Sequence, residues 1–540
     1  MGRSPSPLGG LWPTQYRGLH WGTSRLFGGY RLLVGKNLES RSDEASLARW
    51  TALIIVGTIL IRLVAAALTP LTFDEAYYWT WSKNLAGGFY DHPPMVALVI
   101  RAGTLIAGDT QLGVRIFSIL LALPMSWAVY RAAEIFFANR MVAATAAILL
   151  NSTMLVWVET VIITPDSPLI VSSAFVLYFL AKVFETQRGA WWLAVGAAVG
   201  AALLSKYNAL FLGPIILIWL LVVPELRRWL ISPWPYLAGV VALAIFSPVL
   251  VWNADHQWVS FVKQFGRVRP SEFRPKFLAG YIPGQVLLAT PAVFLLGASG
   301  IYALGRGAVG TRAAAVLLCV TVGMLAGYFG AHSLHAEVHP DYLSPAYPAL
   351  AMAAAVAVHL VKWNERWQRI LDFMHRWIIP ASTAMFVLLM LQINFGWFSA
   401  YQSDPIVRIT AVGFPSVAKE IAAVRDRIGA SCLLVGDFGT TAWLMFYLPP
   451  GSCVAQRPER FRWVNMPEPP SALMQGKLLF VSANIPSWRY LRKSYRQWTL
   501  VAQVERKRGP TAIESYELVQ LDARREDVFE RSPAPELDPP

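Results

Sequence analysis

The chain has 540 residues, of which 55% are hydrophobic, 13% aromatic and only 15% charged. This composition excludes an ordinary soluble protein, in which about 25% of residues are charged. A net charge of +14 would suit nucleic-acid binding, but the Lys and Arg residues stand singly between apolar runs, where they set the orientation of membrane helices. The sequence therefore predicts a polytopic membrane protein that binds no nucleic acid.

The first 49 residues are basic and contain no apolar core followed by a cleavage site, so we expect a cytoplasmic segment. Apolar stretches close to the roughly 20 residues that cross a bilayer then recur throughout residues 50–398, the predicted transmembrane domain. The run Pro94 to Ala107 is shorter and carries Arg101, which is typical of an interfacial helix. We predict about eleven spans, near residues 51–69, 113–130, 141–161, 167–181, 189–204, 208–223, 235–252, 284–303, 313–331, 343–361 and 377–397.

With this assignment, every connection on the side of the N-terminus is basic, as the positive-inside rule requires. The acidic and histidine-containing connections fall on the other side. One outer loop, residues 253–283, breaks the rule with five cations, and we expect Arg267 and Arg269 in it to bind an anionic group. We therefore expect an inner (plasma) membrane protein with its functional site on the extracytoplasmic face.

After Trp397 the composition becomes globular, with a helical pattern at 416–428. Strand-like segments follow at 432–436, 477–483 and 515–521. These patterns predict a small extracytoplasmic α/β domain over residues 399–523, followed by a charged, proline-rich and disordered tail at 524–540. Cys432 and Cys453 flank predicted strands in an oxidising compartment, so we expect them to form a disulfide.

Two motifs in the first outer loop could carry chemistry. Asp74 and Glu75 follow the first span directly, and carboxylates there can act as a general base or a metal ligand, or Asp74 can simply cap a helix. Further along, Asp91 and His92 precede two prolines, which either hold an acid and an imidazole toward one pocket or form a stiff turn.

Two further motifs lie at the ends of later spans. Asp166 stands at the start of a span, where it can cap the helix or face a cavity. Lys206 ends another span, where its ammonium can extend to the interface or meet a phosphate. None of these motifs is specific alone.

Together, FDEAYYW, YDHPPMV, TPDSPL, SKYNAL and HPDYLSPAYPAL resemble, in order and spacing, the membrane glycosyltransferases of GT-C type. The chain is most similar to the family that unites protein O-mannosyltransferases, aminoarabinose transferases of lipid A and rhizobial lipopolysaccharide galacturonosyltransferases. This resemblance implies a mainly α GT-C bundle with outer interfacial helices, a polyprenyl-phosphate sugar as donor and a cavity for the lipid phosphate. The residues that match are Asp74, Glu75 and Asp166 as catalytic groups, and Asp91, His92, Lys206, His339 and Asp341 as substrate-binding groups.

The function expected from this resemblance is inverting transfer of the sugar to an extracytoplasmic hydroxyl, on lipopolysaccharide, lipid A or another envelope glycan, with Asp74 as the base. Aminoarabinose transferases carry a Glu-Lys pair in place of Asp91 and His92, which argues against an aminoarabinose donor. No cofactor is required; carboxylates and His92 could supply ligands to a divalent metal, but their spacing does not demand one.

The alternative is a transporter or lipid-linked sugar flippase, which predicts ionisable residues at mid-span and pseudo-symmetric halves. The acids of this chain gather in outer loops instead. A third possibility is a structural or assembly subunit, but such a protein would have no use for the paired acidic motifs.

Overall fold

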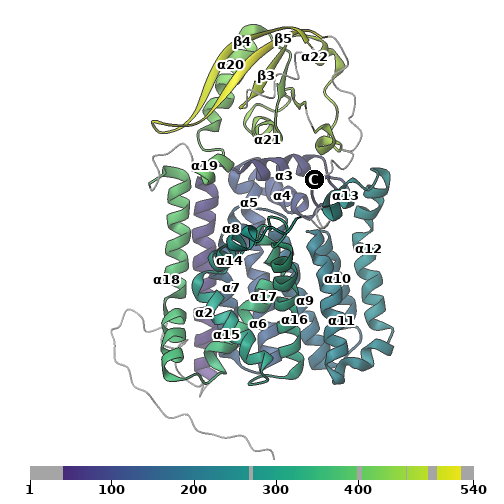
Figure 1. Cartoon of the computed structure of the whole chain (residues 1–540), viewed down its shortest axis with the longest axis vertical. Coiled ribbons are helices and arrows are strands. Elements are labelled where there is room, and N and C mark those ends of the chain that lie inside the picture. The colour runs from purple at the N-terminus through teal and green to yellow at the C-terminus, as the bar shows by residue number, and fades with distance from the viewer. Residues whose placement is uncertain (1–40, 267–271, 398–403, 458, 484–494, 525–540) are drawn as a thin grey trace, which may run out of the picture.

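A computed structural model of the chain describes residues 41–266, 272–397, 404–457, 459–483 and 495–524. A helical bundle forms one part, and a domain built on a five-stranded sheet covers one end of it (Figure 1). The helices of the bundle are α2 (Arg41–Leu68), α5 (Gln111–Leu120), α6 (Ala122–Phe137), α7 (Arg140–Asn151), α8 (Met154–Val161), α9 (Asp166–Thr186), α10 (Trp191–Leu203), η2 (Tyr207–Phe211), α11 (Leu212–Val222), η3 (Pro224–Ile231), α12 (Trp234–Asp255), α14 (Lys276–Ala289), α15 (Pro291–Gly305), α16 (Arg312–His332), η4 (Pro340–Ala346), α17 (Tyr347–His359) and α18 (Glu365–Phe395).

The described part of the chain holds six helices long and apolar enough to cross a membrane, or nine if each of three bent helix pairs is one span. The predicted count of eleven is not reached on this measure. The two remaining predicted spans, 189–204 and 343–361, coincide with α10 and α17, which are only 13 residues long. The first span also begins earlier than predicted, because Asp43 and Glu44 supply an acidic first turn to α2.

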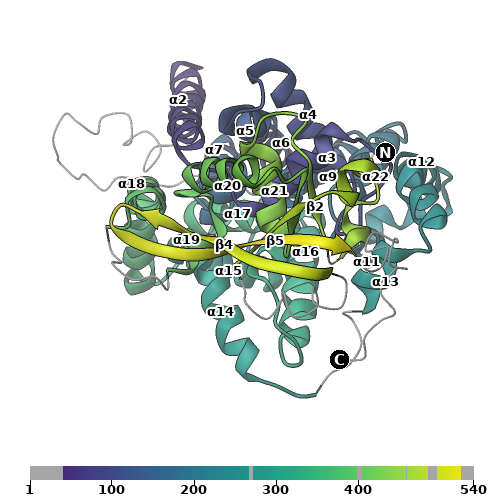
Figure 2. The same ribbon diagram turned by 90° about the horizontal axis from the view of Figure 1, so that it is seen from above.

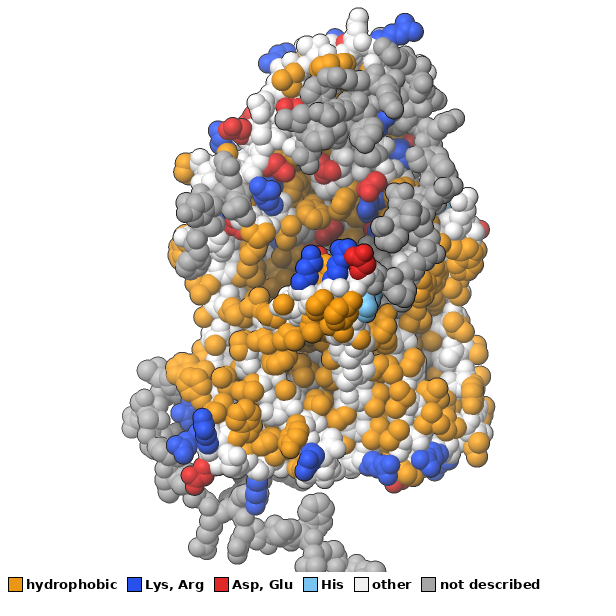
Figure 3. All heavy atoms as spheres, viewed as in Figure 1, with side chains coloured by type: hydrophobic (Ala, Val, Ile, Leu, Met, Phe, Trp, Pro, Cys, Tyr) orange, Lys and Arg blue, Asp and Glu red, His pale blue; other side chains and the backbone are white. Residues whose placement is uncertain are grey.

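The outside of the bundle is apolar, as lipid contact requires. Large side chains such as Leu60, Val64 and Val240 are well exposed there. Figure 3 shows this orange band, with basic side chains gathered at the end of the bundle that lies away from the sheet domain. The composition and the exposed apolar surface together identify a multi-pass membrane protein.

Inside the bundle, a buried arginine joins the first span to the fourth and fifth helices. Arg62 of α2 is fully buried and donates to the side-chain oxygen and the carbonyl of Asn151, at 3.1 and 3.0 Å. Its guanidinium lies 4.5 Å from the ring centroid of Trp157 in α8. A cation in this position needs such partners because lipid offers none.

Two short helices lie across the end of the bundle beneath the sheet domain (Figure 1). They are α3 (Phe73–Lys83) and α4 (Met95–Ala107). α4 buries Val96 and Ile100 and exposes Leu105 and Ile106, as an interfacial helix does. The prediction that residues 94–107 form no full span agrees with the 13-residue length of α4.

The C-terminal domain has a mixed sheet with strand order β2-β1-β3-β5-β4, in which β1 pairs in parallel with β2 and β3, and β5 pairs antiparallel with β3 and β4. The long β4–β5 hairpin crosses above the bundle (Figure 2). The elements outside the bundle that complete the chain are α13 (Val259–Gly266), α19 (Pro405–Ile409), α20 (Phe414–Ile428), β1 (Cys432–Val435), α21 (Phe438–Tyr447), β2 (Val454–Gln456), η5 (Arg460–Trp463), α22 (Ser471–Gln475), β3 (Leu478–Ser482), β4 (Tyr495–Arg508) and β5 (Thr511–Arg524).

Four of these elements match the predicted helix and strands, namely α20, β1, β3 and β5. The disulfide between Cys432 and Cys453 is confirmed; it joins β1 to the turn before β2, with the two Cα atoms 4.8 Å apart. The predicted tail lies outside the described residues except for its first residue, Arg524, which ends β5.

The C-terminal domain is packed firmly on α3. Phe73 of α3 makes edge-to-face contacts with Phe438 and Trp443 of α21, at ring centroid distances of 5.5 and 6.1 Å. The backbone N–H of Ala411 donates to the carbonyl of Leu71 at 2.8 Å. One continuous apolar core therefore includes α3, α4 and the sheet domain, and this core fixes α3 against the bundle.

Candidate active site

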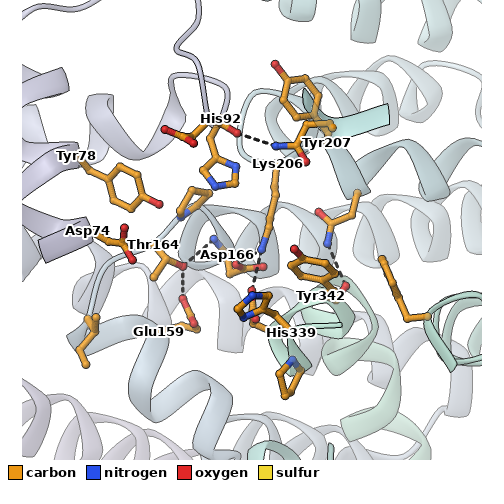
Figure 4. Close-up of a pocket in the computed structure, with 18 of the residues that line it drawn as sticks. Asp74, Tyr78, His92, Glu159, Thr164, Asp166, Lys206, Tyr207, His339 and Tyr342 are labelled. Carbon is orange, nitrogen blue, oxygen red and sulfur yellow. Dashed lines mark hydrogen bonds and ion pairs between the residues drawn. The ribbon is translucent and has the colours of Figure 1, made fainter. Parts of the chain in front are cut away.

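A cavity of about 1130 Å³ lies where the bundle meets the C-terminal domain. Helices α3, α8, α9, α13, α14, α16 and η4 contribute to its wall, and so do α21 and η5 of the C-terminal domain. Figure 4 shows the polar part, with Asp74 and Tyr78 on one side and Lys206, Asp166 and His339 facing them. The cavity brings together most of the residues singled out from the sequence.

Asp74 owes its orientation to the helix start beside it. The N-cap of α3 is Thr72, whose side chain accepts from the N–H of Glu75 while the Glu75 side chain accepts from the N–H of Thr72. This corrects the reading of Asp74 as the cap. Asp74 is left free to face the cavity.

The carboxylate of Asp74 has no hydrogen-bond or ion-pair partner among the described side chains, unlike the other acids that line the cavity. Its pKa is raised to about 7, because burial and then repulsion from Asp91 and Glu75 raise it more than Arg462 and Lys263 lower it. A carboxylate with a free electron pair and a pKa near neutrality is suited to accept a proton.

Glu75 does not line the cavity, in contrast to its prediction as a catalytic group. Its fully buried carboxylate receives two hydrogen bonds of 2.6 Å from the guanidinium of Arg115 in α5. It also accepts from the backbone N–H of Ile163 at 3.1 Å. Because adjacent helix residues point about 100° apart, Glu75 faces the bundle while Asp74 faces the cavity.

Asp91 is held by side chains from three elements, α3, η5 and α13. Its carboxylate receives hydrogen bonds from Tyr77 at 3.0 Å and from Arg462 of η5 at 2.9 Å on each oxygen, and it forms an ion pair with Lys263 of α13. Burial alone would raise the pKa of Asp91, but Lys263 and Arg462 outweigh burial and hold that pKa below its ordinary value. His92 lines the cavity beside Asp91.

Lys206 is buried between two carboxylates. Its ammonium lies 2.5 Å from Asp166 and 2.9 Å from Asp341, and Ser344 donates to the other oxygen of Asp166 at 2.5 Å. The Lys206 side chain therefore does not extend to the interface, because its ammonium is held in ion pairs with both carboxylates. Asp166 does not cap α9 with its side chain but faces this cluster.

The sequence reasoning missed Glu159 and Tyr342. Glu159 of α8 lines the cavity and accepts a hydrogen bond from Thr164, whose hydroxyl in turn accepts from the N–H of Asp166 at 3.1 Å. Tyr342 places its ring 5.0 Å from the ammonium of Lys206 and near His339. Glu159 could have been found from the sequence as an acid inside an apolar span.

Arg267 and Arg269 lie outside the described residues, so their predicted role stays a prediction. Lys263, from the same basic loop, does line the cavity. Within the described ranges, no group of three or more His, Cys, Asp or Glu side chains is placed to hold a metal ion.

The part of the cavity away from the acids is apolar. Leu210, Leu287 and Tyr328 line it, and their exposed fractions are 45%, 58% and 37%. Figure 3 shows a hollow just above the apolar band, with charged side chains at its rim. One continuous space thus joins a charged part to an apolar part.

Comparisons with known proteins agree with this geometry. The pattern of the family described as dolichyl-phosphate-mannose-protein mannosyltransferase matches residues 91–252. The lipid A galacturonosyltransferase RgtD of Rhizobium johnstonii (strain DSM 114642 / LMG 32736 / 3841) is 27% identical over 448 residues, which is 80% of this chain and 90% of RgtD. The crystal structure of ArnT from Cupriavidus metallidurans bound to undecaprenyl phosphate has the same fold, with a TM-score of 0.61 over 87% of this chain and 98% of ArnT, at 15% identity.

The chain is a glycosyltransferase, and it is similar in sequence and fold to those of GT-C type. A second relative, the lipopolysaccharide core galacturonosyltransferase RgtA of the same Rhizobium strain, is 26% identical over 205 residues, or 37% of this chain and 41% of RgtA. In this glycosyltransferase the matched region 91–252 contains Asp91, His92, Asp166 and Lys206, and the ArnT-like fold extends over both the bundle and the C-terminal domain.

Proposed function

We propose that this glycosyltransferase moves a sugar from a polyprenyl-phosphate donor to a hydroxyl of an envelope glycolipid, with inversion at the anomeric carbon, on the extracytoplasmic face of the inner membrane. The observation that carries the proposal is Asp74, a cavity carboxylate without a partner, in a space that opens toward lipid. The polar end suits a sugar phosphate, and the apolar end suits an isoprenoid chain.

The apolar lining of the cavity and the ligand named for ArnT both favour a lipid-linked sugar as the donor. The apolar wall of Leu210, Leu287 and Tyr328 has no purpose for a water-soluble nucleotide sugar, but it would bury a polyprenyl chain. ArnT is a protein whose structure holds undecaprenyl phosphate. RgtD acts on lipid A by name, which favours lipid A or lipopolysaccharide as the acceptor here.

The reaction assigns separate roles to the acids. Asp74 removes the proton of the acceptor hydroxyl as its oxygen attacks the anomeric carbon, and the polyprenyl phosphate departs from the opposite face. Asp166 and Asp341, held by Lys206, accept hydrogen bonds from sugar hydroxyls and fix the ring. The phosphate leaves with an added negative charge, which cations in the cavity compensate.

The decisive experiment is transfer by purified protein in detergent. Lipid A is incubated with a panel of undecaprenyl-phosphate sugars that includes a uronic acid, a hexose and aminoarabinose, and products are identified by mass spectrometry. We expect a mass increase of one sugar with one donor of the panel. Transfer from a nucleotide sugar but from no lipid-linked sugar would refute the proposal.

A further inference from the structure

Arg462 is a charged residue that the C-terminal domain contributes to the wall of the cavity. It belongs to η5 and lies 371 positions from Asp91 in the sequence, yet it donates to both oxygens of that carboxylate at 2.9 Å. Its guanidinium stacks over the rings of Phe438 and Tyr90, at 4.8 and 5.4 Å. These ring contacts and the hydrogen bonds to Asp91 together hold the side chain in one orientation.

The segment that carries Arg462 is anchored to α3 and α12 through the carbonyl of Arg462 and the side chain of Asn465. Tyr77 donates to the carbonyl of Arg462 at 3.2 Å. Asn465 donates to the carbonyl of Gly88 and accepts from the indole of Trp252, each at 2.9 Å. A guanidinium placed so exactly by several hydrogen bonds is pre-organised rather than an incidental surface contact.

The partners of Arg462 indicate which kind of ligand it would take. One nitrogen of the Arg462 guanidinium and the ammonium of Lys263 share one buried carboxylate, Asp91, while Nε of Arg462 pairs with the partly exposed Glu459 at 2.6 Å. Two cations on one carboxylate could bind two oxygens of a phosphate in the same way. Lys206, by contrast, is already matched by two acids. Two cations share one buried acid at Asp91, whereas one cation faces two acids at Lys206, so among the described cations of the cavity Arg462 and Lys263 are the pair better suited to an anion from outside.

We infer that Arg462, together with Lys263, binds the phosphate of the polyprenyl-phosphate donor, so that the C-terminal domain supplies part of the donor site. Asp91 then acts as an internal anion that occupies these cations until the phosphate replaces it. This inference rests on the proposed function, and it gives the C-terminal domain a direct part in the reaction.

The test measures binding rather than turnover, with undecaprenyl phosphate as the probe and undecaprenol, which lacks the phosphate, as its control. Arg462→Gln should weaken binding of undecaprenyl phosphate by about tenfold or more, because charge-assisted hydrogen bonds are lost. Arg462→Lys should show a smaller loss, since it keeps the charge without the bidentate geometry. Undecaprenol binding should not change, and Arg425→Gln, in the same domain but away from the cavity, should behave as wild type.

Asp91→Asn separates this inference from a purely structural role. If Arg462 and Asp91 merely latch the two domains together, both variants lose binding alike. If Asp91 competes with the phosphate, Asp91→Asn binds undecaprenyl phosphate more tightly, a change opposite in sign to that of Arg462→Gln. Loss in both variants, or no change in Arg462→Gln, overturns the inference and leaves the proposed function intact.

Lipid A, which also carries phosphate, is the second probe. A loss of lipid A binding in Arg462→Gln, with undecaprenyl phosphate binding unchanged, would place an acceptor phosphate at Arg462 and overturn the inference. If the wild-type protein fails to bind undecaprenyl phosphate at all, the proposed donor itself is wrong and the inference falls with it.

Discussion

Asp74 and Glu75 are neighbours in the sequence, but Asp74 faces the cavity and Glu75 forms a buried ion pair with Arg115. Substitutions at the two positions should therefore have different effects. Asp74→Asn keeps the shape of the side chain but removes the basic electron pair, so turnover should fall by about 100-fold or more. Expression and thermal stability in detergent should stay near those of wild type, since Asp74 has no partner to lose among the described residues. Near-normal turnover would move the base to another acid.

The pH dependence of turnover follows from the same residue. The pKa of Asp74 is raised to about 7, and the base must be deprotonated to act. The rate should therefore be low at acidic pH, rise through about pH 7 and level off above it. The residual activity of Asp74→Asn should lack this rise; a rise of the same size in the variant would assign it to a different group.

Glu75→Gln should instead damage the fold. The change leaves the guanidinium of Arg115 buried without its counter-charge, and both side chains are fully buried. Breaking such a pair typically costs about 3–5 kcal/mol of the free energy of unfolding. A clear fall in the melting temperature of the purified variant is expected, and an unchanged melting temperature would contradict the structural role of the pair.

At the scale of the helices, close packing of α15 on α17 depends on glycine. A Cβ atom at Gly300 would lie 1.8 Å from the carbonyl oxygen of Ala353. Gly300→Ala should force these helices apart, at about 1–3 kcal/mol, and lower the melting temperature. Gly57→Ala in α2, where nothing lies within 4 Å of the new atom, is the matched control and should melt at or slightly above the wild-type temperature.

The elements that the sequence predicted well are those whose signal is local. A membrane-spanning helix is recognised in the sequence by the length of its apolar run, and strands such as β1 and β3 are recognised as short apolar runs. β4 was missed because most of its first half is exposed, including apolar Trp498 and Leu500, so its sequence shows no strict alternation of apolar and polar residues. The short helices α10 and α17 show why the number of spans did not follow from hydropathy: length alone does not decide whether a buried helix crosses.

The candidate site could be predicted only in part, for a related reason. Asp74, Asp91, Asp166 and Asp341 stand in motifs, whereas their partners come from distant parts of the chain. Arg462 lies in a domain whose sequence gave no sign of a link to the cavity, and the contact with Asp91 exists only through tertiary packing. For the same reason the sequence analysis expected Lys206 to extend to the interface or to meet a phosphate, and did not predict the two acids that enclose it.

For the whole molecule, the orientation in the membrane stays a prediction that labelling can test. In a variant whose free thiol Cys319 is replaced by Ser, a new cysteine is placed at exposed Ser471 in the C-terminal domain, or at exposed Ala308 at the opposite end of the bundle. An impermeant thiol reagent applied to intact cells with a permeabilised outer membrane should label Ser471→Cys only. Labelling of Ala308→Cys alone would reverse the orientation.

The buried arginine of the first span has a consequence for how the protein is made. When α2 leaves the ribosome, Arg62 enters the bilayer about 90 residues before its partners Asn151 and Trp157 have been synthesised. An arginine alone at such a depth is costly in lipid. Until α7 and α8 arrive, the apolar side chains of α2 must offset that cost, about 2.5–3.5 kcal/mol on the scale of helix insertion, so the first helix becomes fully stable in the membrane only after the later ones are made.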